Sequence, residues 1–265
     1  MSTAADDVGF SVVRVESDGA IGELVLDRPE KLNALSLAVL EEVVAAAEWF
    51  SGRSEIKVVI VRGAGRAFSA GADLTAMGGA DSDADESARR DAVDLGRRAA
   101  EALTTTRPLT IAAIHGHCVG GGLVLAAACD LRLAADDAVF SIPEVDLGIP
   151  LAWGGIPRLV REIGPALTKE LVLTCRPFSA GEAKEAGFLN RVVPAADLAA
   201  EAEGLALQLA GQPAYSLELT KRQVNQVAEQ SGSTSESQGD ADLLLGALAD
   251  PESMKKMLDY LADHS

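Results

Sequence analysis

Three consecutive glycines and one later glutamate are the residues best suited to chemistry in this sequence. Gly120, Gly121 and Gly122 follow a short apolar run and begin an apolar helical pattern, and Glu144 has apolar neighbours within the segment 140–148. The first N–H groups of a helix have no partner inside the helix and carry the positive end of its dipole, and glycine lets a ligand approach the backbone closely. Such groups stabilise an anion, while a glutamate can move a proton. Together they predict proton transfer beside a carbonyl group.

The composition is that of a globular protein with a strongly acidic surface. Hydrophobic residues make up 48% of the 265 residues, charged residues make up 24%, and the formal net charge is −17. This charge argues against a protein that binds nucleic acid or an anionic membrane. The three cysteines lack the spacing of a metal site, and neither a signal peptide nor a membrane-spanning stretch is visible. We therefore expect reduced cysteines and a cytoplasmic protein.

Short strands alternate with helices along the chain, which predicts an α/β fold. Strands are expected at 10–15, 21–26, 57–62, 110–115, 131–134 and 138–141, and a hairpin turn at 17–19. Helices are expected at 37–50 with Ser36 as N-cap, and at 92–103, 158–163, 166–174, 180–186 and 195–209. Two polar segments, 78–91 and 229–241, are expected to be loops, the first either a surface loop that enters a helix or a lid over a pocket.

Four segments, in this order, resemble the crotonase superfamily, the enoyl-CoA hydratase/isomerase group. They are LDRPEKLNAL (26–35), VVIVRGAGRAFSAGADL (58–74), IAAIHGHCVGGGLVLAAACDLRLAADDAVFSIPEVDLGI (111–149) and RPFSAGEAKEAGFLNRVVP (176–194). The resemblance implies a catalytic core of repeated ββα units with two sheets over residues 1–200. It also implies a C-terminal helical region over 201–265 that packs trimers, often paired into hexamers. The substrates it implies are acyl-CoA thioesters, with neither a metal nor a redox cofactor.

By the same resemblance, the backbone N–H groups of Ala70 and Gly121 hold the oxygen of a thioester enolate, and Glu144 is the acid/base residue. A tight turn would account for the glycines alone, and a surface position at the end of a strand would account for Glu144. Contacts to the acyl-CoA substrate are expected from Arg28, Lys31, Arg66, Ser69, Ala72, Asp73, Leu74, Gly120, Val124 and Trp153. Among these, the three cations match positions near the family's contacts to the CoA phosphates.

Val124 departs from the hydratase pattern, in which a second glutamate at this position helps to hold the attacking water. Dienoyl-CoA isomerases carry aspartates at the positions of Val124 and Ala152, and both are absent here. Asp146 would point the same way as Glu144 in an extended segment, which makes it a candidate second acid. We therefore expect isomerisation of 3-enoyl-CoA to trans-2-enoyl-CoA by Glu144. The alternatives are an enoyl-CoA hydratase that uses Glu144 alone and an acyl-CoA-binding protein without turnover.

Overall fold

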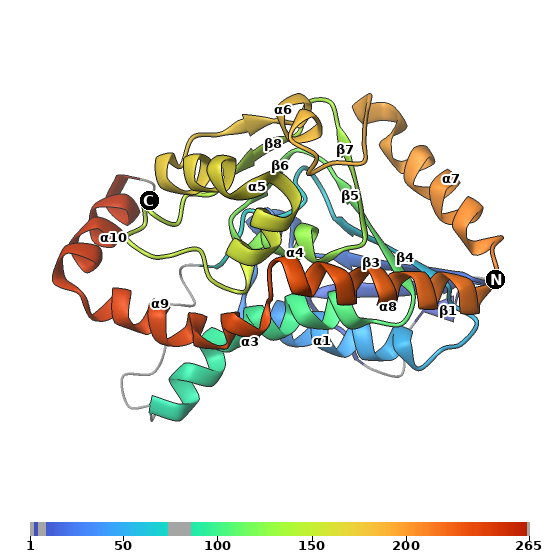
Figure 1. Ribbon diagram of the computed structural model, residues 1–265, viewed down its shortest axis with the longest axis horizontal. Helices are drawn as coiled ribbons and strands as arrows, with labels where there is room; N and C mark the ends of the chain where they lie inside the picture. The colour runs from blue at the N-terminus through green and yellow to red at the C-terminus, as the bar shows by residue number, and fades with distance from the viewer. Residues whose placement is uncertain (1–2, 5–8, 74–85, 264–265) are drawn as a thin grey trace.

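A seven-stranded sheet forms the centre of the computed structural model, which describes residues 3–4, 9–73 and 86–263 (Figure 1). The strands run in the order β1-β2-β3-β4-β5-β7-β10 and comprise Thr3–Ala4 (β1), Val13–Asp18 (β2), Ile21–Leu26 (β3), Val58–Gly63 (β4), Leu109–Ile114 (β5), Leu131–Ala135 (β7) and Arg191–Val193 (β10). The first three strands pair antiparallel, and β3 to β10 pair in parallel. Parallel strands are buried on both faces, which explains the continuous apolar runs of β4 and β5.

Helices cover both faces of this sheet. α1 (Leu37–Ser51) begins after Ser36, whose Oγ accepts the N–H of Val39, as the sequence predicts. α1 packs against α3 (Glu86–Thr105) and on one face of β3. Phe50 of α1 lies directly on Gly22 of β3, where a Cβ atom would collide with its ring. On the other face, α7 (Leu198–Ala210) follows the turn η2 (Ala195–Asp197) and covers β4, β5 and β7 (Figure 1).

A second sheet of three short strands positions the glycine run. Its order is β6 (His117–Val119), β8 (Val139–Ser141) and β9 (Phe178–Ser179). The chain leaves β5, turns at Gly116 with a φ of +57°, forms β6 and then enters α4 (Gly121–Ala128). All eight residues of α4 are buried, and the helix packs against α3, α5 (Gly155–Thr174) and β6. A helix surrounded by protein must be apolar on every side, as this sequence is.

The C-terminal part is helical and packs against the N-terminal part of the chain through α3. It comprises α8 (Ala214–Ser231), η3 (Ser235–Gly239), α9 (Asp240–Ala249) and α10 (Pro251–Asp263). α9 runs beside α3 (Figure 1), and α10 contacts the segment after Glu144, where Gly148 lies against the backbone of Ser253. In the described part of the chain, no helix is both long and apolar enough to cross a membrane.

The structure confirms the α/β fold with two sheets and C-terminal helices, and it corrects several boundaries. α3 begins at Glu86, so the segment 78–91 leads into a helix earlier than expected, while residues 74–85 lie outside the described part. The helices expected at 158–163 and 166–174 are one element, α5, with a kink at Gly164 before Pro165. The segment 229–241 is largely helical, since α8 extends to Ser231 and η3 follows. A domain boundary at residue 200 stays a prediction.

Candidate active site

A small chamber brings the glycine run and Glu144 together. Its volume is about 30 Å³, and it is lined by Ala72, Gly121, Val124, Glu144, Ile149, Pro150, Leu151, Ala152, Trp153 and Leu244. These residues come from the segment before the undescribed residues 74–85, from the start of α4, from the turns between β8 and α5, and from α9. Glu144 is the only charged residue among these described lining residues. The chamber is therefore an apolar site with one acid–base group.

The carboxyl group of Glu144 is buried and weakly solvated. The residue is 9% exposed, and its Oε2 atom has no hydrogen-bond partner among the described residues. Burial raises the pKa of Glu144 to about 7, because loss of water disfavours the charged form. Gly120 makes room for this group: its φ is +48°, and a Cβ there would collide with Glu144 Oε1. A carboxyl group with a near-neutral pKa can both take up and return a proton.

The N-terminus of α4 supplies a backbone donor on the same chamber. Gly121 is the first residue of the helix, and no described residue accepts its N–H. The helix dipole adds partial positive charge at this point, and the buried surroundings weaken its screening. Gly122 packs against Ser69, since a Cβ at Gly122 would lie 2.7 Å from Ser69 Cβ. Gly120 and Gly122 thus lack a Cβ atom where Glu144 and Ser69 lie closest to the backbone.

Ala72 also places an N–H group without a described acceptor on the chamber, whereas the family resemblance implied Ala70 as the donor. The N–H of Ala70 donates to Leu32 O at 2.9 Å, and Ala70 does not line the chamber. Leu35 pairs with Ala72 as a parallel bridge, in which Leu35 donates to Gly71 O and accepts from the N–H of Asp73. Successive N–H groups of an extended segment point in opposite directions. The N–H of Ala72 therefore faces away from Leu35, and no described residue accepts it.

Asn33 connects the turn after Arg28 to the segment 64–67 through its side chain. This structural role of Asn33 was not predicted from the sequence. Its side chain is 1% exposed, its Nδ2 donates to Ala64 O and Ala67 O at 2.8 Å, and its Oδ1 accepts the N–H of Arg28 at 3.0 Å. Its φ of +55° is a left-handed conformation that Asn tolerates better than most residues. The presence of Asn in LDRPEKLNAL could have predicted a left-handed turn at this position, since Asn adopts this conformation more readily than most residues.

Ser69 and Arg28 do not line the chamber but hold nearby backbone in place, and their expected contacts with the substrate stay predictions. Ser69 is fully buried, its Oγ donates to Asn33 O at 2.8 Å, and it accepts the N–H of Gly71 at 3.2 Å. The Arg28 guanidinium donates to Asp73 Oδ2 at 2.9 Å and to Ala34 O at 2.8 Å. These bonds fix the backbone on either side of Ala72.

Lys31 and Arg66 are exposed cations in neighbouring loops. Lys31 ends the short helix η1 (Pro29–Lys31), and Gly65 lies against it, since a Cβ there would be 2.8 Å from Pro29 Cβ. Cations in two neighbouring loops suit a phosphate group. The contact of Lys31 and Arg66 with the CoA phosphates stays a prediction. Leu74, which was expected to contact the substrate, lies outside the described residues.

No second carboxylate joins Glu144 among the described lining residues of the chamber. Val124 is fully buried in the lining, where it can neither orient water nor accept a proton. The expectation that Asp146 points the same way as Glu144 is wrong, because the segment turns: Leu147 donates to Pro143 O, and Ile149 to Glu144 O. Asp146 is instead an exposed residue whose Oδ1 lies 3.7 Å from Lys256 Nζ.

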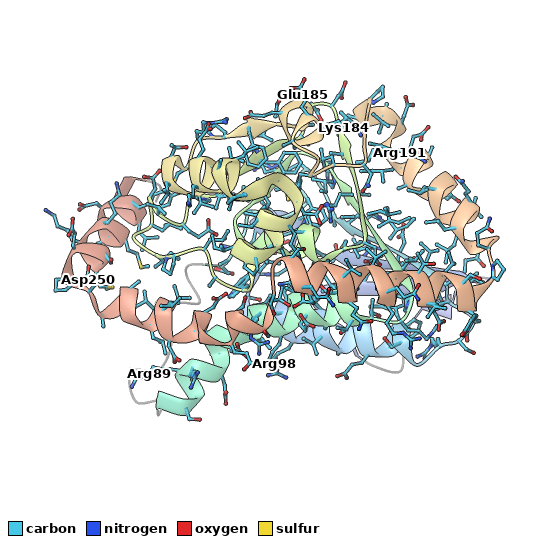
Figure 2. The ribbon with its side chains drawn as sticks, in the orientation of Figure 1. Arg89, Arg98, Lys184, Glu185, Arg191 and Asp250 are labelled. Carbon is cyan, nitrogen blue, oxygen red and sulfur yellow. The ribbon has the colours of Figure 1, made fainter. Side chains whose placement is uncertain are left out.

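A larger apolar cavity adjoins the chamber. Its volume is about 280 Å³, and it is lined by Leu35, Leu37, Leu40, Ala72, Asp73, Arg89, Ala92, Val93, Trp153, Leu244, Leu245, Leu248 and Ala249. It shares Ala72, Trp153 and Leu244 with the chamber. Arg89, on the N-terminal part of α3, is exposed and adds a cation to the lining (Figure 2). We call this space the outer cavity.

Comparison with known proteins agrees with this architecture. The sequence pattern described as enoyl-CoA hydratase/isomerase matches residues 16–262. A probable enoyl-CoA hydratase of Mycobacterium bovis is 38% identical over 84% of this chain and 84% of that protein. A peroxisomal Δ(3,5)-Δ(2,4)-dienoyl-CoA isomerase of Arabidopsis thaliana is 38% identical over 69% of each chain. The solved structure of an enoyl-CoA hydratase/isomerase from Xanthobacter autotrophicus has a TM-score of 0.86 at 31% identity, covering 93% of this chain and 91% of that one. This chain therefore belongs to the enoyl-CoA hydratase/isomerase (crotonase) family of acyl-CoA enzymes.

Proposed function

We propose that the enzyme isomerises 3-enoyl-CoA to trans-2-enoyl-CoA. The thioester oxygen accepts hydrogen bonds from the N–H groups of Ala72 and Gly121. Ionised Glu144 removes a proton from C2, which gives a dienolate whose oxygen stays between the two donors. Protonated Glu144 then returns the proton to C4. One C2–H bond breaks, one C4–H bond forms, the double bond moves from C3–C4 to C2–C3, and Glu144 regains its starting state.

The single carboxyl group among the described lining residues of the chamber carries this proposal. Isomerisation needs one group that takes and returns a proton on one face of the substrate, and Glu144, with its pKa near 7, suits both steps. The two backbone donors suit the dienolate oxygen, and one such donor is typically worth about 10²–10³ in kcat. Water addition, in contrast, needs a water molecule held and polarised, and Val124 offers no acceptor for it.

Enoyl-CoA hydration is the second candidate, and the names of relatives favour it. The Mycobacterium bovis relative is called a probable enoyl-CoA hydratase, and a relative from Clostridium acetobutylicum, 33% identical, is called a short-chain-enoyl-CoA hydratase. In this alternative Glu144 alone activates the water. Acyl-CoA binding without turnover fits less well, because a binding protein gains nothing from a buried carboxyl group without a partner.

Two assays on one preparation test the proposal. The first follows conversion of a 3-enoyl-CoA to the conjugated trans-2-enoyl-CoA, and the second follows loss of trans-2-enoyl-CoA by hydration. We expect a kcat/KM for isomerisation well above that for hydration. Faster hydration than isomerisation would reject the isomerase and favour the hydratase. Tight acyl-CoA binding with neither activity would favour the binding protein.

A further inference from the structure

Trp153 stands between the chamber and the outer cavity. It lines both spaces, together with Ala72 and Leu244. On one side lie Glu144 and the start of α4, in a space of about 30 Å³. On the other side lies a space of about 280 Å³ whose lining is mostly apolar, with leucines of α1 and α9 and with Asp73 and Arg89 as its charged residues. An acyl chain that extends from Glu144 into the second space therefore lies against residues shared by both spaces, Trp153 among them.

Two glycines form the slot that holds this indole. A Cβ at Gly121 would collide with Cζ3 of Trp153, and a Cβ at Gly96 of α3 would collide with its Cε2. The ring therefore packs directly on the backbones of two helices that come from different parts of the chain. Close packing of this kind leaves little room for another rotamer.

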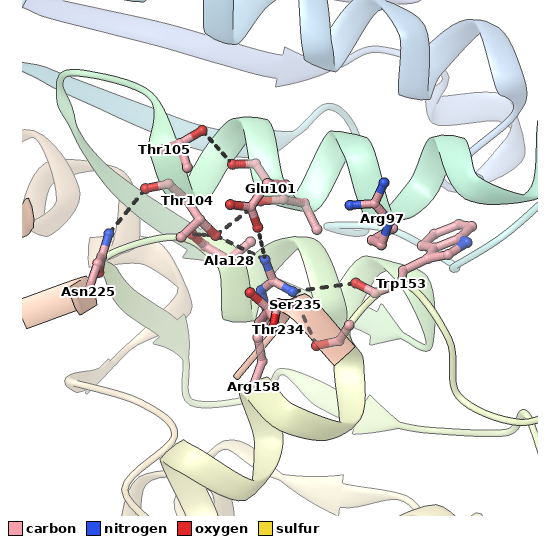
Figure 3. Close-up of polar contacts among 12 residues, drawn as sticks. Arg97, Glu101, Thr104, Thr105, Ala128, Trp153, Arg158, Asn225, Thr234 and Ser235 are labelled. Carbon is pink, nitrogen blue, oxygen red and sulfur yellow. Dashed lines mark hydrogen bonds and ion pairs between the residues drawn. The ribbon is translucent and has the colours of Figure 1, made fainter. Parts of the chain in front are cut away.

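The backbone of Trp153 is also held in place. Its φ is +60° and that of Gly154 is +70°, so two successive residues are left-handed. The N–H of Gly154 donates to Asp240 Oδ2 at 2.8 Å. Figure 3 shows the buried Arg158 beside this turn, where its Nη1 donates to Gly154 O at 3.2 Å and contacts Trp153 O at 3.5 Å. The indole is thus presented by a turn that is fixed on both sides.

Arg158 connects this turn to α3. Its Nη2 lies 3.3 Å from Glu101 Oε2 and 3.2 Å from Thr104 Oγ1, and the side chain is 1% exposed (Figure 3). The helix that carries Gly96, one side of the slot, is therefore tied to the turn that carries Trp153. Arg158 thus connects the slot to the turn that carries the indole.

We propose that Trp153 determines acyl-chain length: the indole limits the reacting chain to the chamber, and a longer chain requires the outer cavity. The apolar lining of the outer cavity suits an alkyl chain, which forms no hydrogen bonds. The proposal rests on the acyl-CoA chemistry proposed above, but it holds for isomerisation and for hydration alike. It predicts that the wild-type enzyme takes short-chain substrates and that a smaller residue at 153 admits long ones.

Binding of saturated acyl-CoA thioesters of four to twelve carbons tests this, because they cannot react. For wild type we expect that the Kd does not fall as the chain lengthens, because the indole keeps the added methylenes out of the outer cavity. For Trp153→Ala we expect it to fall by about fourfold for each added methylene over part of the series, the value for moving a methylene from water into an apolar site. A Kd that falls steadily with chain length in wild type, or one that does not fall in Trp153→Ala, would overturn the proposal.

Trp49→Phe is the matched control, because it removes the other of the two tryptophans. Trp49 lies on α1, with the Arg53 guanidinium 3.5 Å from the centre of its ring, and it lines neither space. This variant should keep the wild-type chain-length profile. It also leaves Trp153 as the only tryptophan, so fluorescence reports on it even if Trp153→Ala does not fold.

In Trp49→Phe, four-carbon acyl-CoA should change the Trp153 emission more than CoA alone does. Equal effects of the two ligands would overturn the placement of the indole beside the acyl group. Failure of the isomerase assay with an intact chain-length profile would reject the reaction assigned above and leave the role of Trp153 standing.

Discussion

At the scale of single residues, Glu144 is buried, and its Oε2 atom has no hydrogen-bond partner among the described residues. Replacing it with Gln keeps the shape of the side chain and removes its ability to take a proton. We expect Glu144→Gln to lower kcat by about 10²–10⁴, the usual contribution of general acid–base catalysis. The Kd for a saturated acyl-CoA should change little. Steady-state kinetics and calorimetry measure the two quantities, and a variant that keeps more than about a tenth of the wild-type kcat would remove Glu144 from the role of base.

The raised pKa of Glu144 also predicts a pH dependence of stability. The group holds its proton in the folded state up to about pH 7, whereas its ordinary pKa is 4.5. Its contribution is therefore fully present below about pH 4.5 and is lost as the pH rises through about 7. The unfolding free energy of Glu144→Gln minus that of wild type should therefore rise by roughly 2–3 kcal/mol when the pH is raised from about 5 to about 8. Urea unfolding at the two pH values measures this gain, and equal differences at both would argue against a raised pKa.

Val124 is the residue that separates the two candidate reactions. Val124→Glu places a second carboxylate on the chamber, so the ratio of hydration to isomerisation should rise. We expect a modest rise, because a buried glutamate must be desolvated, lacks orienting partners and repels Glu144. The two assays on the folded variant measure the ratio. An unchanged low ratio would leave isomerisation in place and refute the explanation from Val124.

At the scale of elements, two aspartates in the first turn of α9 allow a matched comparison. Asp240 accepts the N–H of the buried Gly154, whereas Asp242 makes an exposed ion pair with Arg90. Asp240→Ala should lower the unfolding free energy by about 1–3 kcal/mol, because it leaves a buried donor unpaired. Asp242→Ala should cost less than about 1 kcal/mol. Denaturant unfolding of both variants decides, and equal losses would mean that α9 is not anchored through Gly154.

The elements that carry the site were predictable where the signal is local. The cap at Ser36, the buried strand β4 and the apolar α4 follow from neighbouring residues. The choice of Ala72 over Ala70 was not predictable, because it depends on where Leu35 pairs with a segment far along the chain. The placement of Trp153 depends in the same way on the missing side chain at Gly96.

At the scale of the whole molecule, the C-terminal helices expose apolar side chains that a single chain does not cover. Exposed fractions above one half are found for Leu207, Tyr215, Val224, Val227, Leu243 and Leu258. Such a surface is typical of an interface between subunits, and closed symmetric assemblies are the usual way to bury it. The family resemblance indicates rings of three.

We therefore predict a homotrimer or a dimer of trimers, measured by light scattering at micromolar concentration. Val224 and Val227 of α8 line neither the chamber nor the outer cavity, so Val224→Glu with Val227→Glu should weaken assembly without touching the site. Asp146→Ala, a change at an exposed charged position, is the control and should assemble as wild type does. A wild-type monomer would contradict the prediction outright. A double variant that assembles normally would exclude Val224 and Val227 from the interface and leave the other exposed apolar residues, such as Leu243 on the helix that lines the outer cavity, as candidates.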